Sequence, residues 1–217
     1  MTLGLAIFDL DGTLLPLPTS QRRLFRRLVD HGYMSPLSAL GRIGVTTARL
    51  AGGGRRCAQA SGAYLAGLDV AAVHAETRGL VEHDLVPLLR TRLLDRIACH
   101  RRRGDYVALV SGAPSFVVRE VAKHLELDAA IGSEPRQRDG YFLDAPVRLH
   151  VVGANKRRVV ESLCRWLQIA PDECTAYADS AEDRWLLSWV HRPVAVAPDA
   201  RLRRIARRRG WDCIEAV

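Results

Sequence analysis

From residue 106 onward the sequence alternates short apolar strands with amphipathic helices, and this order constrains the fold more than any other feature. In chain order we expect a strand at 106–110, a helix near 115–125, a strand at 174–178, a helix near 182–189, a strand at 194–197, an arginine-rich helix at 201–209 and a last strand at 211–214. Strands that are joined through helices lie parallel in one sheet, whose two faces the helices cover. The predicted fold class is therefore α/β, with a Rossmann-like parallel sheet.

A long segment, residues 16–103, interrupts this order. Before it, the apolar run at residues 3–7 is typical of a buried strand, which we expect in the same sheet. Within the segment, apolar residues recur at the three- and four-residue spacing of helices, over Leu24–Val29, Ile43–Leu50 and Val81–Ile97. We therefore expect a core formed by residues 1–15 and 104–217, with an all-helical domain inserted at 16–103. A hairpin is expected between residues 136–138 and 141–144.

Composition limits the class of protein. A chain of 217 residues with 48% hydrophobic and 26% charged residues is typical of a soluble globular protein with a full core. No apolar run approaches the roughly 20 residues needed to cross a bilayer, and the early first strand leaves no room for a signal peptide. Five cysteines without Cys-x-x-Cys spacing argue against a disulfide framework or a zinc site. We expect a cytoplasmic protein without a membrane span, and the sequence sets no oligomeric state.

The net charge of +8 comes almost wholly from arginine, since the chain has only two lysines, Lys123 and Lys156. Such a balance can attract nucleic acid, an anionic membrane surface or phosphorylated substrates, or it can simply form a solvated face. On the helix at 201–209, the arginines share one face and aliphatic residues share another. Because aromatic residues that would stack on bases are not interleaved with these arginines, a solvated face is favoured and nucleic-acid binding is not.

Polar residues follow the predicted strands, where ligands bind in an open parallel sheet. They are Asp9 and Asp11 after the first strand, Ser111-Gly112 after the strand at 106–110, Lys156 at the start of a helix, and Asp179 and Asp183 after the strand at 174–178. Gly12 favours a sharp turn beside the first pair, and Thr13 offers a hydroxyl there. Paired carboxylates, a hydroxyl and an ammonium group together suit a Mg²⁺-assisted phosphoryl transfer with a carboxylate nucleophile.

Each of these residues, taken alone, has a simpler interpretation. The first aspartates can close a strand in an Asp-Gly turn, and Ser111 can cap a helix. Asp179 and Asp183 can be a helix cap and a charge that interacts favourably with a helix dipole, while Lys156 can be a solvated helix charge. Their joint occurrence at strand ends, in this order, favours the catalytic interpretation.

The same stretches resemble the motifs of the haloacid dehalogenase superfamily of phosphatases. They are Asp9-Leu10-Asp11-Gly12-Thr13, Val110-Ser111-Gly112-Ala113-Pro114-Ser115, Lys156, and Asp179-Ser180-Ala181-Glu182-Asp183. The helical segment directly after the first motif is similar to the cap of the phosphoserine-phosphatase-like branch. The resemblance covers residues 1–15 and about 104–217, whereas the segment between them matches only in position and helicity.

Carried over residue by residue, the resemblance implies the following roles. Asp9 attacks phosphorus and becomes an aspartyl phosphate, and Asp11 protonates the leaving alkoxide and then deprotonates the hydrolytic water. The Asp9 carboxylate, the Asp11 main-chain carbonyl and Asp179 hold Mg²⁺. Asp183 acts from behind these ligands or orients the catalytic Lys156.

The phosphoryl group is expected to contact Thr13, Ser111, Gly112 and Lys156. The second aspartate also argues against halide chemistry, since a dehalogenase needs no acid for its leaving group.

The substrate must be read by the cap, where the sequence departs from the phosphoserine phosphatases. They carry an early cap glutamate for the substrate amine, whereas residues 16–21 hold no acid. Candidate substrate contacts in the cap are Ser20, Arg22, Arg42 and Arg49. We expect a small polar phosphate ester other than phosphoserine. The alternatives are a lipid phosphate of the phosphatidylglycerophosphate type, a phosphotransferase reaction, or an arginine-rich protein that binds anionic surfaces and has a vestigial site.

Overall fold

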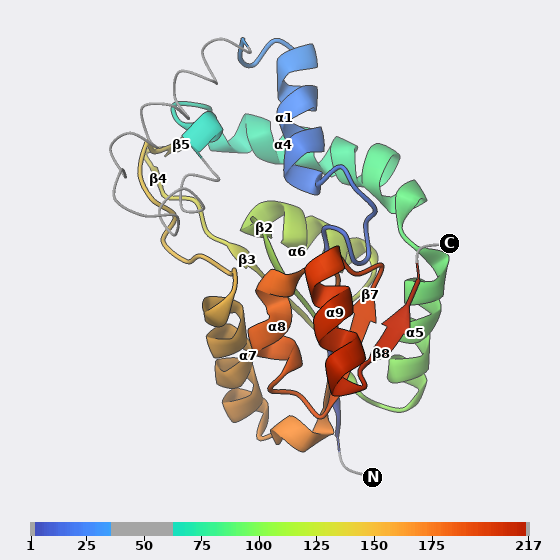
Figure 1. Cartoon of the computed structure of the whole chain (residues 1–217). Coiled ribbons are helices and arrows are strands. Elements are labelled where there is room, and N and C mark those ends of the chain that lie inside the picture. Colours follow the sequence, from blue (N-terminus) through green and yellow to red (C-terminus); the bar gives the residue numbers. More distant parts are fainter. Residues whose placement is uncertain (1–2, 36–62, 216–217) are drawn as a thin grey trace.

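A six-stranded parallel sheet forms the centre of the protein. The computed structural model describes residues 3–35 and 63–215, and its strands follow the order β3-β2-β1-β6-β7-β8 (Figure 1). These are β1 (Leu5–Phe8), β2 (Tyr106–Pro114), β3 (Ala129–Ser133), β6 (Cys174–Ala178), β7 (Arg192–Val196) and β8 (Asp212–Ile214). All four residues of β1 are buried, as expected for a central strand covered on both faces. The predicted α/β fold is confirmed.

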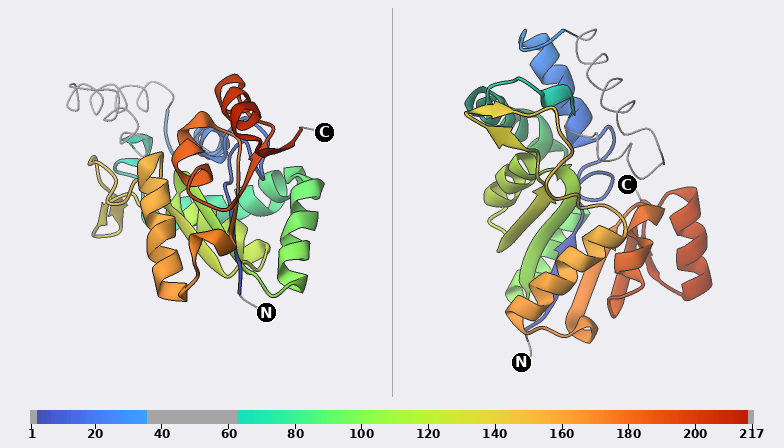
Figure 2. Two further views of the ribbon diagram at one scale, coloured as in Figure 1. Left: turned by 60° about the horizontal axis from the view of Figure 1, so that its bottom comes forward. Right: turned by 90° about the vertical axis from the view of Figure 1, so that its left-hand side faces the viewer.

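Alternate residues of β1 pack into two separate apolar clusters, one on each face of the sheet. Leu5 and Ile7 belong to the cluster beneath α7 (Ala154–Leu167), α8 (Arg184–Leu187) and α9 (Ala200–Arg209). Ala6 and Phe8 belong to the cluster on the other face, which includes α5 (Thr91–Arg102) and α6 (Ser115–His124). Figure 2 shows the helices on either side of the sheet. The period-two alternation of side chains along β1 thus connects both layers.

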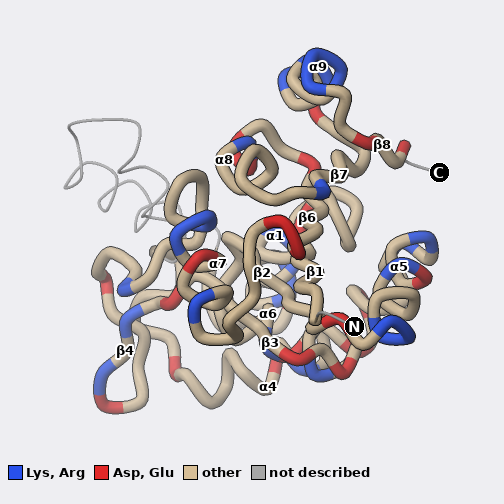
Figure 3. Tube along the Cα trace, turned by 90° about the horizontal axis from the view of Figure 1, so that it is seen from below, with Lys and Arg blue, Asp and Glu red and all other residues tan. Residues whose placement is uncertain are grey.

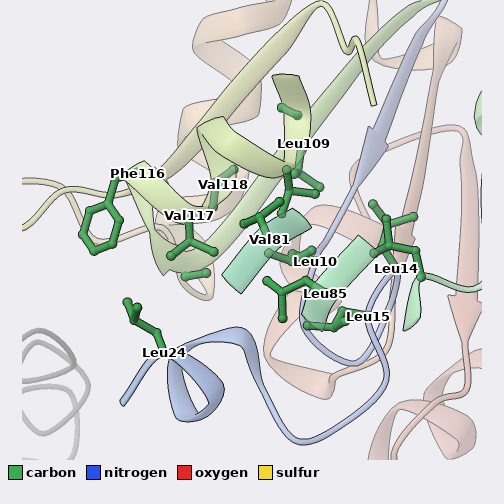
Figure 4. Packing of buried hydrophobic residues seen from close by; sticks show 14 of the residues in the cluster. Leu10, Leu14, Leu15, Leu24, Val81, Leu85, Leu109, Phe116, Val117 and Val118 are labelled. Atoms are coloured by element: carbon green, nitrogen blue, oxygen red, sulfur yellow. The ribbon is translucent and has the colours of Figure 1, made fainter. Parts of the chain in front are cut away.

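The helices that follow the first motif lie beyond the carboxyl ends of the strands. They are α1 (Ser20–Asp30), a short 3₁₀ turn (Ala63–Leu65), α4 (Val70–Leu80), a π-helical turn (Val81–Leu85) and a second 3₁₀ turn (Val86–Leu88). Leu10 and Leu14 pack in one cluster with Leu24, Val81 and Leu85 (Figure 4). The motif loop is therefore held between the sheet and the helical segment. The expected helix around Ile43–Leu50 lies outside the described residues.

The helix α5 contacts the sheet. His100 Nε2 lies 2.9 Å from the hydroxyl of Tyr177 on β6, and His100 Nδ1 lies 2.7 Å from Asp105 Oδ2. Tyr177 also stacks on Phe8, with ring centroids 4.3 Å apart. The division into a core (1–15 and 104–217) and a cap (16–103) stays a prediction, but α5, which falls inside the predicted cap, packs on the core.

The predicted hairpin is present and touches the helical segment. It consists of β4 (Gln137–Arg138) and β5 (Tyr141–Phe142), paired antiparallel. The Gly67 amide donates to the Phe142 carbonyl at 2.8 Å, and the Phe142 amide donates to the Leu68 carbonyl at 3.0 Å. A third bond runs from the Val70 amide to the Gly140 carbonyl, at 2.8 Å. The hairpin thus joins residues 67–70 by strand-like backbone pairing.

The described part of the chain contains neither a helix that could span a membrane nor a disulfide bond. None of its helices is both long enough and apolar enough to cross a bilayer. Its four cysteines are all free, and Cys57 lies outside it. The arginine-rich helix α9 is amphipathic as expected, because Leu202 and Ala206 are buried while Arg204 and Arg208 are exposed.

Candidate active site

Two carboxylates meet where the adjacent strands β1 and β6 end. Asp9 follows β1 and is buried, and its amide donates to the carbonyl of Tyr177 on β6 at 3.0 Å. Asp179 follows β6 directly. Gly12 follows Asp9 by three residues and turns the chain with φ +84. A Cβ built on it would overlap the Asp179 carboxylate. Glycine is therefore required here both by its backbone conformation and by the close approach of Asp179.

Lys156 joins this pair from the first turn of α7. Its side chain is only 3% exposed, and Nζ donates to Asp9 Oδ1 at 2.8 Å and to Asp183 Oδ2 at 2.9 Å. Burial alone lowers the pKa of a lysine, but Asp183 and Asp9 outweigh it and raise the pKa of Lys156 above its ordinary value. Lys156 is therefore a fixed positive charge in the site, and the interpretation as a solvated helix charge is wrong.

The acids around Lys156 carry more negative charge than one ammonium group neutralises. Burial, reinforced by Asp9 and Asp183, raises the pKa of Asp179 to about 7. Burial raises the pKa of Asp183 to about 6, with Asp9 adding to it and Lys156 opposing it. An excess of carboxylate in a partly dry site is the setting that a bound cation stabilises.

The donor set fits Mg²⁺. Asp9, Asp179 and Asp183 each bring one carboxylate oxygen within 4.8 Å of the other two. Carboxylate oxygens are the ligands that hard divalent cations prefer. Asp183 accepts a bond from Lys156 and also belongs to the cluster of three carboxylates. The Asp11 carboxylate is not part of this cluster.

Asp11 is turned toward the start of α1. Its Oδ1 accepts a bond from the Ser20 amide at 2.6 Å, and its Oδ2 accepts one from the Ser20 hydroxyl at 3.0 Å. Burial raises the pKa of Asp11 to about 6, although the two bonds from Ser20 act to lower it. A carboxyl group with a pKa near neutrality can give and take a proton at physiological pH. Ser20, predicted as a substrate contact, is fully buried and positions Asp11 instead.

The predicted site residues line one cavity of about 380 Å³, with the exception of Thr13. The ones it brings together are Asp9, Asp11, Ser111, Gly112, Lys156, Asp179 and Asp183. Thr13 is fully buried, and its hydroxyl lies 3.4 Å from both Asp9 Oδ2 and Asp179 Oδ1. Its side chain therefore faces the carboxylates, and its phosphate contact stays a prediction.

The structure excludes the helix-cap interpretations. Strand β2 continues past Ser111 to Pro114, so the helix α6 begins only at Ser115 and has no side-chain cap. Ser180, not Asp179, caps the turn after β6, by accepting a bond from the Glu182 amide at 3.2 Å. The carboxylate of Asp183 accepts a bond from Lys156. Neither Ser111 nor Asp179 caps a helix, although the Ser111 hydroxyl accepts a bond from the Ala113 amide at 3.3 Å.

Some residues that line the catalytic cavity belong to no sequence motif. Leu17, Thr19 and Gln21 enter the cavity from the loop before α1 and from its first turn, and His150 comes from the segment before α7. Glu182 adds a carboxylate at the rim. Only the cavity itself reveals them, because they converge from distant parts of the chain. Arg22 lines a different hollow, of about 750 Å³, beside α1 and α4, and Arg42 and Arg49 lie outside the described residues.

We predict that Gly12→Ala removes metal binding and activity. Replacing glycine by alanine at a left-handed backbone position lowers the free energy of unfolding by about 1 kcal/mol. At Gly12 the new methyl group also displaces Asp179. Gly140→Ala is a matched control, because Gly140 has φ +83 but nothing lies within 4 Å of the place that a Cβ would take. Urea denaturation should show a similar backbone penalty in both variants, while Mg²⁺ titration should show lost affinity only in Gly12→Ala. Equal Mg²⁺ affinity in the two would contradict the geometry.

We also predict that the metal-free protein loses stability as the pH rises from about 4 to about 7. Asp11, Asp179 and Asp183 have pKa values of about 6 to 7 in the fold against 3.8 ordinarily. The folded state therefore holds their protons more tightly than the unfolded state, so deprotonation favours unfolding in this window. Unfolding by urea in EDTA should show the decline, and excess Mg²⁺ should reverse it at about pH 7. Asp179→Asn should flatten the EDTA profile, and an unchanged profile would count against the assignment.

Comparison with known proteins places the chain in a family. The profile of the haloacid dehalogenase-like hydrolases matches residues 6–188. Phosphoserine phosphatase SerB1 of Mycobacterium tuberculosis is 30% identical over 216 residues, which cover 95% of this chain and 69% of that protein. A Bordetella pertussis protein of unknown function is 27% identical, with a TM-score of 0.84 and 99% of both chains covered. A substrate-bound phosphoserine phosphatase shares the fold, with 18% identity, a TM-score of 0.68, and 100% of this chain and 94% of that one covered.

The profile match, the relatives and the strand-end carboxylates agree with one another. The chain therefore belongs to the haloacid dehalogenase-like hydrolases, in their phosphoserine-phosphatase-like branch, and is a phosphatase.

Proposed function

We propose that the protein is a Mg²⁺-dependent phosphomonoesterase in which Asp9 is the nucleophile. The observation that carries this proposal is the position of Asp9, whose Oδ1 accepts a bond from the buried Lys156 while its carboxylate faces Asp179 and Asp183. The carboxylate is thereby oriented at the floor of a cavity that opens to substrate.

In the first half of the proposed reaction, Asp9 attacks phosphorus and the bond from phosphorus to the ester oxygen breaks. Asp11 donates its proton to the departing alkoxide, for which its pKa of about 6 is suited. In the second half, Asp11 takes a proton from water, the water oxygen attacks phosphorus, and the bond to Asp9 breaks to release phosphate. Ser20 holds Asp11 in place through both halves.

The other residues bind and balance charge. Lys156, Ser111 and Gly112 line the cavity and contact the phosphoryl oxygens in this proposal. The Asp9 carboxylate, the Asp179 carboxylate and the Asp11 main-chain carbonyl would hold Mg²⁺, and Asp183 orients Lys156. When bound, the cation neutralises charge that develops on the phosphoryl oxygens.

The proposal includes residues 1–15 and 104–217 as the catalytic core and 16–103 as the cap. It places the reaction in the cytoplasm, which the free cysteines of the described chain support. The assay that tests it is hydrolysis of p-nitrophenyl phosphate by the purified protein. We expect turnover with Mg²⁺ and none with EDTA, and turnover that is insensitive to EDTA would contradict the role of the cation.

For the substrate, we propose a small polar phosphate ester other than phosphoserine. No acid occupies residues 16–21, and the lining residues Thr19 and Gln21 from this stretch are neutral. A neutral lining suits hydroxyl groups better than an ammonium group. A cavity of about 380 Å³ also matches a small leaving group.

Phosphoserine is the second candidate, because Glu182 lines the same cavity and SerB1 is named a phosphoserine phosphatase. A panel with glycerol phosphate, histidinol phosphate and phosphoserine, ranked by kcat/KM, separates the two. We expect phosphoserine to rank below the others, and Glu182→Gln to leave that order unchanged. A strong preference for phosphoserine that is lost in Glu182→Gln would favour the second candidate.

A further inference from the structure

A second polar cavity lies away from the active site, between α5 and the strands β6, β7 and β8. Its volume is about 390 Å³. Its floor includes Thr175 and Tyr177 of β6 and Val194 of β7, which point to the face of the sheet that α5 partly covers. We call this cavity the α5 groove. It is lined by Arg92, Arg96, Cys99, His100, Arg103, Thr175, Tyr177, Arg192, Val194, Asp212, Cys213 and Ile214.

Arginines line both sides of the α5 groove. Arg92, Arg96 and Arg103 recur at helical spacing along one side of α5 and just beyond its end, where Figure 3 marks basic residues in blue. Arg192 opens β7 across from them, and its backbone is paired with that of Thr175 on the floor. Four guanidinium groups thus surround one hollow from two separate elements of the fold.

The positive charge of the α5 groove is not neutralised within the described part of the chain. The side chains of Arg92, Arg96 and Arg192 form no hydrogen bond or ion pair with any described residue. Arg103 Nε lies 3.8 Å from Asp105 Oδ2, and that oxygen already lies 2.7 Å from His100 Nδ1. Asp212 is the acid among the described lining residues. The groove therefore carries a clear excess of positive charge.

We propose that the α5 groove is a binding site for a small, elongated polyanion that carries several phosphate groups. Arginine forks match phosphate oxygens in charge and geometry. Arg92 and Arg96 are one helical turn apart, about 6 Å along the axis, so the row suits linked phosphates better than a single one. The volume of the groove is that of a small-molecule site.

The α5 groove is separate from the catalytic cavity, since the two share no lining residue. Tyr177 nevertheless connects them, because it forms part of the groove floor, stacks on Phe8, and accepts the amide of Asp9 through its carbonyl. A ligand in the groove would thus rest on the strand β6, which Asp179 follows directly.

The test is calorimetric titration of the full chain with inorganic tripolyphosphate in EDTA. Without a cation, the acids of the active site disfavour anions there, so binding reports on other sites. We expect saturable 1:1 binding that weakens about tenfold or more in the double variant Arg96→Gln, Arg192→Gln. The matched control is Arg204→Gln, Arg208→Gln on α9, which removes the same charge and should bind as the wild type. Equal losses in both variants would show that only net charge matters and would overturn the proposal.

A footprint provides a second readout that does not depend on the arginine variants. Cys213 is exposed and lines the α5 groove. Tripolyphosphate should slow its alkylation by iodoacetamide, followed by mass spectrometry of the peptide, whereas orthophosphate at equal ionic strength should not. Undiminished alkylation at saturating tripolyphosphate would place any binding elsewhere and overturn the proposal.

Discussion

The Asp9→Asn variant is expected to lose hydrolysis of p-nitrophenyl phosphate by about a thousandfold or more, because an amide cannot attack phosphorus as a carboxylate does. The substitution keeps the shape of the side chain, and Lys156 keeps its bond to Asp183 at 2.9 Å. The variant should therefore fold, and loss of turnover will report on the chemistry rather than on stability. Steady-state kinetics with saturating Mg²⁺ measure the effect.

A matched control is available in Asp139→Asn. Asp139 is an exposed aspartate with φ +51, a conformation that asparagine also tolerates. Its variant should retain full activity. If Asp9→Asn were as active as this control, Asp9 would not be the nucleophile, and the proposed reaction would fail at its first step.

The Lys156→Met variant should lose both activity and stability. Methionine fills the space of the lysine stem but leaves the buried carboxylates of Asp9 and Asp183 without their cation. Removing one partner of a buried ion pair costs about 3 to 5 kcal/mol of unfolding free energy. We expect a loss of this size in EDTA near neutral pH, measured by urea denaturation, and a smaller loss with excess Mg²⁺, which in the proposed reaction binds among the same acids.

Lys123→Met serves as the control, since the Lys123 side chain is 79% exposed and pairs only loosely with Glu120, at 3.9 Å. Surface ion pairs of this kind contribute little, so its unfolding free energy should change by less than about 1 kcal/mol. A Lys156→Met protein as stable in EDTA as this control would show that the acids do not depend on the ammonium group.

Local patterns are enough to predict five of the six strands of the sheet and the acids of the candidate site, whereas β3 (Ala129–Ser133) is not predicted. Strand β6 has the bounds that its apolar run predicts, 174–178, because a central strand must be apolar on both faces. The rule that ligands bind at the carboxyl ends of parallel strands then brings Asp9 and Asp179 together from the sequence alone. Lys156 is predicted on the same ground, although its burial between two acids depends on tertiary packing.

Other features depend on contacts between distant segments and could not be predicted. Ser20 is only one of four candidate substrate contacts in the sequence, and α1 begins where its amide and hydroxyl reach Asp11. Sequence spacing does not specify that approach. The α5 groove escaped prediction for the same reason, since Arg192 and the arginines of α5 are far apart in the sequence.

The hairpin β4–β5 has a mechanical consequence for the helical segment. This segment is joined covalently to the sheet at both ends, and the hairpin bonds to residues 67–70 add a third attachment. These contacts restrict movement of the helical segment relative to the hairpin. We therefore expect the hairpin to travel with the helices, and with it the strand of chain that leads to His150 and on to Lys156. Through the hairpin, the helical segment is therefore connected to the chain that lines the cavity at His150 and Lys156.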